Sequence, residues 1–349
     1  MAIIVPGTEN HAAKPPLNRA ATGIEIVATG SYAPANIVRN TDLAQLGCDE
    51  EWIVQRTGIL ERRHASNNEA TSDLALAAAR DCLRKANVAA RDVDLILVAT
   101  MTADHFTPST ASIVQSRLCS SAAAIDMNAA CSGFMYGLIT AAQFVKTGCY
   151  RQVLVIGADK MSAVIDPQDE KTYPLFGDAA GAALVRAHPQ GNNGVGILAF
   201  RLASEGELGY LISVPGCGSR QPATANVLAE RNQYLHMTGK PVFKWAVRII
   251  PHAIDLVLSD AKLSLSDIDL LILHQANRRI VDAAVSQLDI PYEKVFVNLD
   301  KYGNTSAASI PLALDEAYQQ GLVRKDGLVL MCGFGAGLTW GACIYKGCG

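Results

Sequence analysis

The feature of this sequence that most restricts its fold is an internal repeat. Residues 92–98 read Asp-Val-Asp-Leu-Ile-Leu-Val, and residues 267–273, which lie 175 positions later, read Asp-Ile-Asp-Leu-Leu-Ile-Leu. An amphipathic helical pattern precedes each copy, and a second helical segment follows it and ends at Gly148 or Gly321, which are 173 positions apart. The repeated order of elements predicts a duplicated fold with two βα-rich halves.

The expected strands are short runs of Val, Ile and Leu that alternate with helices. Such runs are typical of parallel strands that are buried on both faces of a sheet, so we expect an α/β fold. The stretch 189–194 is rich in turn-forming residues. We therefore divide the chain into an N-terminal extension (1–22), an N-terminal half (23–190) and a C-terminal half (191–349).

Composition narrows the class of protein. The 349 residues are 50% hydrophobic and 18% charged, with a formal net charge of −3, as in a globular chain with a large core. The small charge argues against a nucleic-acid partner. No apolar run approaches the roughly 18 residues that a membrane-spanning helix needs. The nine cysteines include no CxxC pair, so we expect no disulfide framework, no metal site and a cytoplasmic location.

The repeat brings three chemically useful residues into related places. Shifting Cys131 by 173 positions lands on Asn304, and both stand among small residues before the long helix of their half. His274 follows directly on the strand 267–273. Because sites in open α/β sheets form at the carboxyl ends of strands, we expect these three residues to meet near a pseudo-twofold axis.

Each of the three also has an ordinary structural interpretation. Cys131 fits a buried cysteine at a strand–helix junction, His274 a core histidine bonded to a backbone carbonyl, and Asn304 a helix cap or turn residue. The functional interpretation of Cys131 rests on its place at the start of a helix. There the helix dipole and the free backbone N–H groups favour a thiolate.

A Cys–His–Asn set suits the condensation of two thioesters. A thiolate takes an acyl group from the first thioester. Neutral His and Asn side chains then donate hydrogen bonds to the carbonyl oxygen of a malonyl thioester, which becomes an enolate when CO2 leaves. Residues 333–337 (Gly-Phe-Gly-Ala-Gly) lie too near the C-terminus for a dinucleotide site. They predict a tight turn with N–H groups aimed at an oxyanion.

The motifs around these residues resemble those of the β-ketoacyl-acyl-carrier-protein synthases III, a family of the thiolase superfamily. The resemblance runs from about residue 23 to the C-terminus and rests on seven segments in order: 30–34, 51–59, 129–134, 176–181, 274–280, 303–309 and 335–341. Asn304 separates the chain from elongating synthases, thiolases and hydroxymethylglutaryl-CoA synthases, which have a second His, a second Cys and a glutamate base.

The resemblance implies a thiolase fold, with duplicated βα halves in a five-layered α-β-α-β-α arrangement, and a homodimer. It implies that Cys131 is acylated, that His274 and Asn304 bind the malonyl thioester, and that the backbone N–H groups of Cys131 and Ala336 form the oxyanion hole. The reaction would join an acyl-CoA primer to malonyl-acyl-carrier protein and start type II fatty acid synthesis. Coenzyme A thioesters are substrates here, and no cofactor is expected.

The resemblance also implies how substrates are bound. The residues that match the family's coenzyme A and pantetheine positions are Trp52, Arg56, Gly239, Phe243, Ala276 and Asn277. Phe106 and Thr107 match the acyl pocket, where Thr107 replaces a bulkier residue of some members and permits a longer or branched primer. Lys244 and Arg279 match carrier-protein docking positions, and Arg248 lies on the same helix face as Lys244.

Two positions depart from the family pattern. Glu170 stands where many members have an arginine that stacks on the adenine, and Lys240 replaces an asparagine at the tunnel mouth. These departures leave an alternative open, namely a starter condensing enzyme or acyltransferase of a secondary-metabolite pathway. A non-catalytic binding subunit with the same fold is a third hypothesis, which an intact Cys–His–Asn set disfavours.

Overall fold

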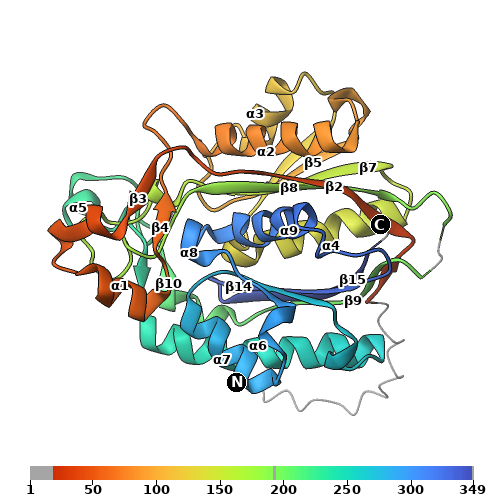
Figure 1. Ribbon diagram of the computed structural model, residues 1–349. Helices are drawn as coiled ribbons and strands as arrows, with labels where there is room; N and C mark the ends of the chain where they lie inside the picture. Colours follow the sequence, from red (N-terminus) through yellow and green to blue (C-terminus); the bar gives the residue numbers. More distant parts are fainter. Residues whose placement is uncertain (1–18, 192–193, 348–349) are drawn as a thin grey trace, which may run out of the picture.

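The computed structural model describes residues 19–191 and 194–347. Two β-sheets alternate with three helical layers (Figure 1). Helices α2 (Thr71–Ala86) and α3 (Thr110–Arg117) cover one sheet from outside, and α6 (Gly239–Ala261) and α7 (Arg278–Leu288) cover the other. The long helices α4 (Gly133–Lys146) and α9 (Ser309–Gln319) lie between the sheets. This is the five-layered thiolase arrangement that was expected.

The two sheets have the same strand order. The first sheet runs β2-β8-β7-β5-β6 and the second runs β9-β15-β14-β12-β13, with β1 at the outer edge of β9. The strands of the first sheet are β2 (Ile24–Tyr32), β8 (Ala179–Ala187), β7 (Gln152–Asp159), β5 (Leu95–Ala99) and β6 (Ala123–Met127). Those of the second are β9 (Gly196–Ser204), β15 (Thr339–Lys346), β14 (Leu328–Gly335), β12 (Leu270–Leu273) and β13 (Val295–Phe296).

The expectation of parallel strands holds for only part of each sheet. Strand β5 is parallel to β6 and β7, and β12 is parallel to β13 and β14. The pairs β7–β8, β8–β2, β14–β15 and β15–β9 are antiparallel. Strand β14 leads into β15 through a tight turn in which Gly335 pairs with Thr339. Such a short connection joins only antiparallel strands.

The N-terminal extension is shorter than expected. Residues 1–18 of the expected segment lie outside the described residues. Ala21–Thr22 form strand β1, which pairs with β9. Because Ala21 is fully buried in the core, the packed part of the chain begins before residue 23.

The correspondence expected between Cys131 and Asn304 is wrong by three residues. The 3-10 turns η3 (Ala130–Ser132) and η8 (Ser306–Ala308) begin 176 residues apart. Both first residues have positive φ, 46° at Ala130 and 51° at Ser306. Cys131 therefore corresponds to Ala307. The offset of 173 applies only at the ends of the helices that follow, because α4 has 14 residues and α9 has 11.

The same register gives the counterparts of the other two residues. Asn304 corresponds to Asn128, and each side-chain Oδ1 accepts the N–H of the residue two positions later, at 2.9 Å and 3.1 Å. His274 corresponds to Ala99, because β5 and β12 pair in the same register with β7 and β14. The asparagine is thus present in both halves, whereas the cysteine and the histidine each occur in one.

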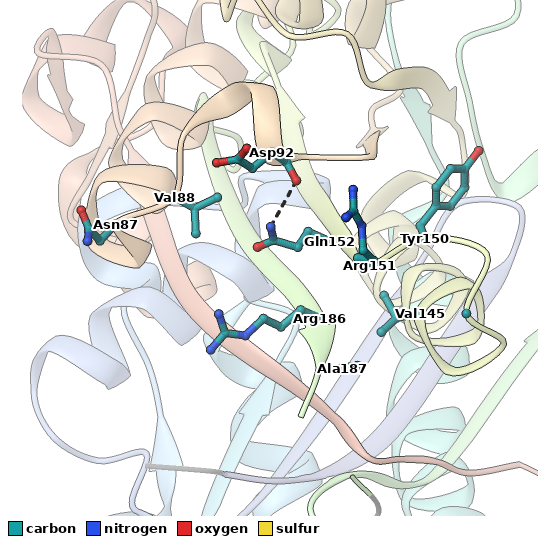
Figure 2. Close-up of a pocket in the computed structure, with 10 residues that line it drawn as sticks. Asn87, Val88, Asp92, Val145, Tyr150, Arg151, Gln152, Arg186 and Ala187 are labelled. Atoms are coloured by element: carbon teal, nitrogen blue, oxygen red, sulfur yellow. Dashed lines mark hydrogen bonds between the residues drawn. The ribbon is translucent and has the colours of Figure 1, made fainter. Parts of the chain in front are cut away.

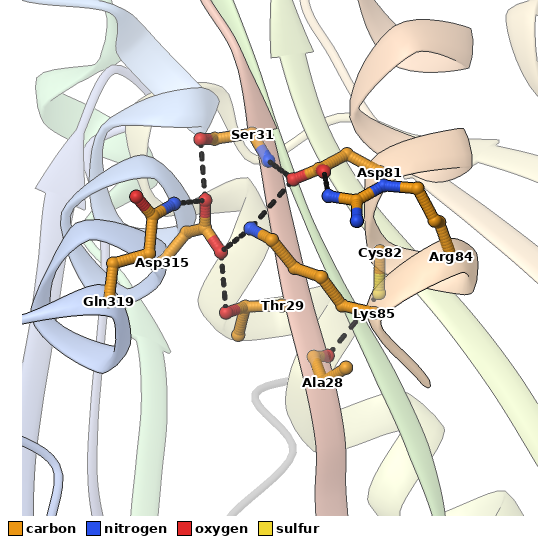
Figure 3. Close-up of polar contacts among 9 residues, drawn as sticks. All are labelled: Ala28, Thr29, Ser31, Asp81, Cys82, Arg84, Lys85, Asp315 and Gln319. Atoms are coloured by element: carbon orange, nitrogen blue, oxygen red, sulfur yellow. Dashed lines mark hydrogen bonds and ion pairs between the residues drawn. The ribbon is translucent and has the colours of Figure 1, made fainter. Parts of the chain in front are cut away.

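A buried polar network holds the central helix α9 to the first sheet (Figure 3). The carboxylate of Asp315, which is 1% exposed, accepts hydrogen bonds from Thr29 (2.8 Å) and Ser31 (2.6 Å) on β2. Lys85 of α2 lies 2.7 Å from Asp315 and 2.7 Å from Asp81. Because Lys85 compensates the buried charge, this network ties the outer helix layer to the central one.

The remaining elements are short and lie beside this frame. They are β3 (Ile37–Arg39), α1 (Glu50–Thr57), β4 (Glu61–Arg63), β10 (Ile212–Ser213), α5 (Ala225–Ala229), β11 (His236–Met237) and α8 (Leu299–Tyr302). None of the helices in the described ranges has the length and apolar character to cross a membrane.

Candidate active site

Cys131 lies between the edge strand β6 and the central helix α4, at the carboxyl end of the first sheet. Cys131 is partly exposed as a whole residue, but its thiol group is surrounded by protein. Gly335 provides the space for it, because a Cβ on Gly335 would stand 2.7 Å from the Cβ of Cys131. Asp159 occupies the position equivalent to Gly335, because it is the last residue of β7 as Gly335 is the last residue of β14. Cys131 thus packs against a residue without a side chain, whereas its counterpart Ala307 packs against the Asp159 carboxylate.

Two opposing influences act on the Cys131 sulfur. Burial raises the pKa of its thiol to about 12, and the charge of Asp159 acts in the same direction. The Ser306 side chain and the backbone N–H groups of Cys131 and Ala336 act in the opposite direction and lower the pKa. Burial is the larger influence on the thiol pKa, whereas the backbone N–H groups act in the direction that was expected at the start of a helix.

His274 is held as a neutral imidazole. It is 1% exposed, and burial lowers its pKa to about 3. The ring packs edge-on against Phe334, with the ring centroids 5.1 Å apart. Its Nδ1 has no hydrogen-bond partner among the described residues, unlike a core histidine that is bonded to a carbonyl. Since Phe334 precedes Gly335, the imidazole lies next to the strand end that borders Cys131.

Asn304 stands before the turn that contacts Cys131. Its Oδ1 accepts the N–H of Ser306 at 2.9 Å, so the Nδ2 group is the end of the amide that is left to donate. The side chain is 6% exposed. The structure therefore places Cys131, Asn304 and His274 around the same strand ends, with Ser306 and Phe334 as the connecting contacts.

Asp159 is a residue of this site that the sequence analysis missed. It is fully buried, and its Oδ1 accepts hydrogen bonds from residues 100–102 at the end of β5. Its Oδ2 accepts the N–H of Ala307 at 3.1 Å, which ties the first sheet to the turn after Asn304. Burial raises the pKa of this carboxyl. One signal was available, because Asp159 is a single acid that ends an otherwise apolar strand.

Two hydroxyls were also missed. The Oγ of Ser132 and the Oγ1 of Thr339 are 2.6 Å apart, although the two residues are separated by 207 positions in sequence. No local pattern pairs two such distant residues, so sequence reasoning had no signal for this contact.

The residues expected at the coenzyme A end of the site come together from both halves. The Arg56 guanidinium lies 4.6 Å from the centroid of the Trp52 ring on α1. Asn277, which caps α7, donates from Nδ2 to the Arg56 carbonyl oxygen at 3.1 Å. Cys48 packs in the same cluster as Trp52, and its thiol pKa is raised first by burial and second by the charge of Glu170. The exposed Glu170 therefore lies near this cluster.

The other expected tunnel residues lie at the starts of α6 and α7. Gly239 begins α6 and is exposed, whereas Ala276 before α7 is half-buried. Phe243 lies under the guanidinium of Arg279, which is 5.5 Å from its ring centroid. This contact joins the two helices at their N-terminal ends.

The expected docking cations differ in their surroundings. Lys244 and Arg279 are exposed, and neither makes an ion pair with another described residue. Arg248 is paired with Glu205 at 3.0 Å. Lys244 and Arg279 are therefore the cations that remain available to a partner.

Phe106 and Thr107 are not in contact with Cys131 within the described chain. Both lie in the exposed loop before α3, and Phe106 is 93% exposed. The start of α3 is tied to edge strand β6, because Asp126 accepts the N–H groups of Thr110 and Ala111, each at 2.7 Å.

A separate hollow of about 460 Å³ lies at the start of β7, where Gln152 begins the strand (Figure 2). It is at the opposite end of the strand from Asp159. Its two arginines are already paired, Arg186 with Glu25 at 2.6 Å and Arg151 with Asp94 at 3.3 Å. This hollow is therefore not part of the site. Within residues 19–191 and 194–347, no cluster of His, Cys, Asp or Glu could hold a metal ion.

Two equivalent sheets around a shared helical layer, with a cysteine at the start of a central helix, define a thiolase-fold condensing enzyme. Two family models match the chain: "3-Oxoacyl-[acyl-carrier-protein (ACP)] synthase III" at residues 125–206 and the C-terminal model of the same name at 258–346. The chain is 55% identical over 339 residues to a β-ketoacyl-[acyl-carrier-protein] synthase III of Rhodopirellula baltica, covering 93% of this chain and 98% of that protein.

Solved structures agree with this comparison. The 3-oxoacyl-[acyl-carrier-protein] synthase III of Aquifex aeolicus matches with a TM-score of 0.86 and 43% identity, covering 93% of this chain and all of that one. The corresponding enzyme of Thermus thermophilus matches with a TM-score of 0.85 and 41% identity, covering 92% and 98%. The chain belongs to the 3-oxoacyl-[acyl-carrier-protein] synthase III family and is an acyltransferase of the condensing type.

Proposed function

We propose that this enzyme condenses an acyl-CoA primer with malonyl-acyl-carrier protein and so starts type II fatty acid synthesis. The products are 3-oxoacyl-acyl-carrier protein, CO2 and free coenzyme A, and one proton is consumed. The observation that carries the proposal is that Gly335, the neighbour of Ala336, lies against Cys131, because a Cβ on Gly335 would stand 3.0 Å from the backbone N and 3.1 Å from the Sγ of Cys131.

In the first half-reaction, the Cys131 sulfur attacks the carbonyl carbon of the acyl-CoA. The C–S bond to coenzyme A breaks, and the coenzyme A sulfur leaves as a thiol with the proton that Cys131 gave up. The Cys131 and Ala336 N–H groups stabilise the oxyanion that forms in between. The support for this role is that both N–H groups lower the pKa of the Cys131 thiol.

In the second half-reaction, malonyl-carrier protein loses CO2, and the electron pair of the broken C–C bond forms an enolate. His274 and Asn304 donate hydrogen bonds to its oxygen. A neutral histidine suits this role, because an imidazole with a pKa of about 3 keeps one N–H without carrying charge. The enolate carbon attacks the acyl-Cys131 carbonyl, and the Cys131 sulfur leaves and regains a proton.

The substrates enter past α1, α6 and α7. Trp52 and Arg56 receive the adenine end of coenzyme A, and Gly239, Phe243, Ala276 and Asn277 line the pantetheine path. The support is that the Asn277–Arg56 bond and the Arg279–Phe243 contact gather these segments at one end of the molecule. Lys244 and Arg279, with Arg248 nearby, bind the acidic carrier protein.

The functional form is a homodimer, in which Phe106 and Thr107 reach the partner's acyl pocket. Strand β6 supports this assembly, because it is the edge strand of its sheet and Ile125 on it is 44% exposed. An uncovered edge strand is a template for pairing with a second chain. In this homodimer the partner covers Phe106, whose side chain is 93% exposed in the single chain.

The chemistry requires no resident cofactor or metal, since the Cys–His–Asn set and two N–H groups supply every step. We also place the enzyme in the cytoplasm. The eight cysteines in the described part of the chain are all unpaired, which suits a reducing compartment.

Mass spectrometry of the intact protein tests this function. The wild type is incubated with a panel of straight and branched acyl-CoAs, and a mass increase of one acyl group is expected. Cys131→Ala is the matched control and gains no mass. The preferred chain length then reports how Phe106 and Thr107 shape the pocket. Absence of acylation by every member of the panel would contradict the proposal.

A further inference from the structure

The hydroxyl groups of Ser132 and Thr339 lie at the turn that holds Cys131. Ser132 is fully buried, and its Oγ stands 2.6 Å from Oγ1 of Thr339. Ser132 Oγ is also 2.8 Å from the Ala129 carbonyl oxygen. Thr339 Oγ1 is 2.9 Å from the same oxygen and 2.8 Å from the Ala336 carbonyl oxygen. The two hydroxyls thus contact the turn that holds Cys131 and the turn that holds Ala336.

The number of hydrogens limits how these contacts are made. Each hydroxyl has one hydrogen to donate, and a separation of 2.6 Å requires one of them to lie between the two oxygens. If Ser132 donates to Thr339, then Thr339 donates to one of the two carbonyls. If Thr339 donates to Ser132, then Ser132 donates to Ala129. In both cases a hydrogen bond crosses from residues 129–132 to Thr339.

The two turns come from opposite halves of the molecule. Cys131 belongs to the turn before α4, whereas Ala336 lies between β14 and β15. No helix or strand contains both segments, so regular secondary structure does not set the separation of their N–H groups. Their separation depends on side-chain contacts between the turns. The hydroxyls of Ser132 and Thr339 provide such contacts, through the Ser132–Thr339 pair and the approach of Thr339 Oγ1 to the Ala129 carbonyl oxygen.

We propose that Ser132 and Thr339 form a positioning clamp that sets the distance between the Cys131 and Ala336 N–H groups. This inference rests on the proposed function for its role in catalysis. The clamp serves the tetrahedral intermediates at Cys131, in acylation and in condensation. It does not serve malonyl decarboxylation, which the proposed function assigns to His274 and Asn304. A loosened clamp therefore affects the half-reactions unequally.

The main test is Thr339→Val, which keeps the shape of the side chain and removes the hydroxyl. Self-acylation by the best acyl-CoA is expected to slow about 100-fold, as for a small misplacement of reacting groups. Decarboxylation of malonyl-carrier protein, measured in a Cys131→Ala background, should stay within about threefold. Thr339→Ser retains the hydroxyl and should restore acylation to within about threefold of wild type. Thermal melting of each variant reports on folding.

A second variant protects the test against a folding failure. Ser132→Ala removes one of the contacts that join the turns and leaves the Thr339 bond to Ala129, so acylation should slow about fivefold, less than for Thr339→Val. The double variant should be no slower than Thr339→Val alone, because the two hydroxyls act as one unit. Acylation at the wild-type rate in either single variant would overturn the clamp. So would equal losses in both half-reactions, or failure of Thr339→Ser to restore acylation.

A measurement without acyl substrate separates this proposal from the proposed function. The Ala336 N–H stabilises the Cys131 thiolate, so Thr339→Val should slow alkylation of Cys131 by iodoacetamide at pH 9 about tenfold. If the wild type accepts no acyl group, the proposed function fails. The alkylation rates still show whether Thr339 positions the Ala336 N–H group. Equal alkylation rates in wild type and Thr339→Val would refute it.

Discussion

Among single side chains, Cys131 shows how burial and hydrogen bonding compete. The N–H groups of Cys131 and Ala336 favour the thiolate, but burial is the larger effect and raises the thiol pKa to about 12. A thiol reacts through its thiolate. The fraction of thiolate at pH 7 is therefore small, and the proton must leave as the substrate arrives.

This balance predicts the pH dependence of alkylation at Cys131. Because the pKa lies above the working range, the rate with iodoacetamide should rise about tenfold per pH unit from pH 7 to pH 10 without a plateau. Peptide mass spectrometry follows Cys131 separately from the exposed Cys119 and Cys149, and Cys131→Ala gives the background. A rate that levels off near pH 7 would show that the N–H groups outweigh burial.

His274 and Asn304 should be separable from Cys131 by their half-reaction. His274→Ala and Asn304→Ala remove donors to the enolate oxygen, so malonyl decarboxylation should fall by about two to three orders of magnitude. Self-acylation should remain, because neither side chain stabilises the acyl transfer to Cys131. Radiolabelled CO2 release and intact mass measure the two steps. Loss of acylation with intact decarboxylation in His274→Ala would reverse the assigned roles.

Among the helices, α6 and α7 present cations beside the proposed tunnel mouth. Arg279 is exposed, packs over Phe243 and has no ion-pair partner among the described residues, whereas Arg248 is paired with Glu205. Arg278, the neighbour of Arg279, is paired with Asp282 at 2.9 Å. These pairs show that only part of the positive charge on this surface is available for a partner.

Arg279→Glu should weaken the reaction of the carrier protein. Reversal of one exposed charge opposes an acidic partner, so we expect the KM for malonyl-carrier protein to rise about tenfold, and added salt to weaken the wild-type reaction. Self-acylation by acyl-CoA should change little. Arg91→Glu, at an exposed arginine that makes no ion pair with another described residue, is the matched control. Equal losses in both half-reactions would point to damage of the tunnel instead of docking.

For the whole molecule, the two halves share a fold but no longer share the same site residues. Both halves retain the asparagine, yet the counterparts of Cys131 and His274 are Ala307 and Ala99. Asp159 fills the place that Gly335 leaves open. The candidate site therefore uses one turn from each half, and neither half contains all of its residues.

The proposed dimer should depend on edge strand β6. Ile125→Lys puts a charge on its exposed apolar side chain, so sedimentation should change from dimer to monomer, with a loss of acylation if Phe106 or Thr107 completes the partner's pocket. Leu228→Lys, at another exposed apolar side chain, is the control and should stay dimeric. A fully active wild-type monomer at assay concentration would disprove the role of the partner.

Local sequence pattern was enough to predict much of the architecture. The repeated segments 92–98 and 267–273 contain most of β5 and all of β12, and the repeat predicted two equivalent halves. Apolar runs that form strands and the periodicity that forms amphipathic helices are both properties of residues close together in sequence. The same patterns brought Cys131, His274 and Asn304 to strand ends, because a strand and its following turn are adjacent in the chain.

Other properties arise only when distant segments pack together. The antiparallel strands depend on pairing between distant segments within each half. The Asp159–Ala307 and Ser132–Thr339 contacts depend on how the two halves meet. The protonation of Cys131 and His274 also follows from packing, since burial is the first cause of both pKa shifts. A residue's neighbours in sequence do not determine its distance from water, and that distance sets the charge of a buried group.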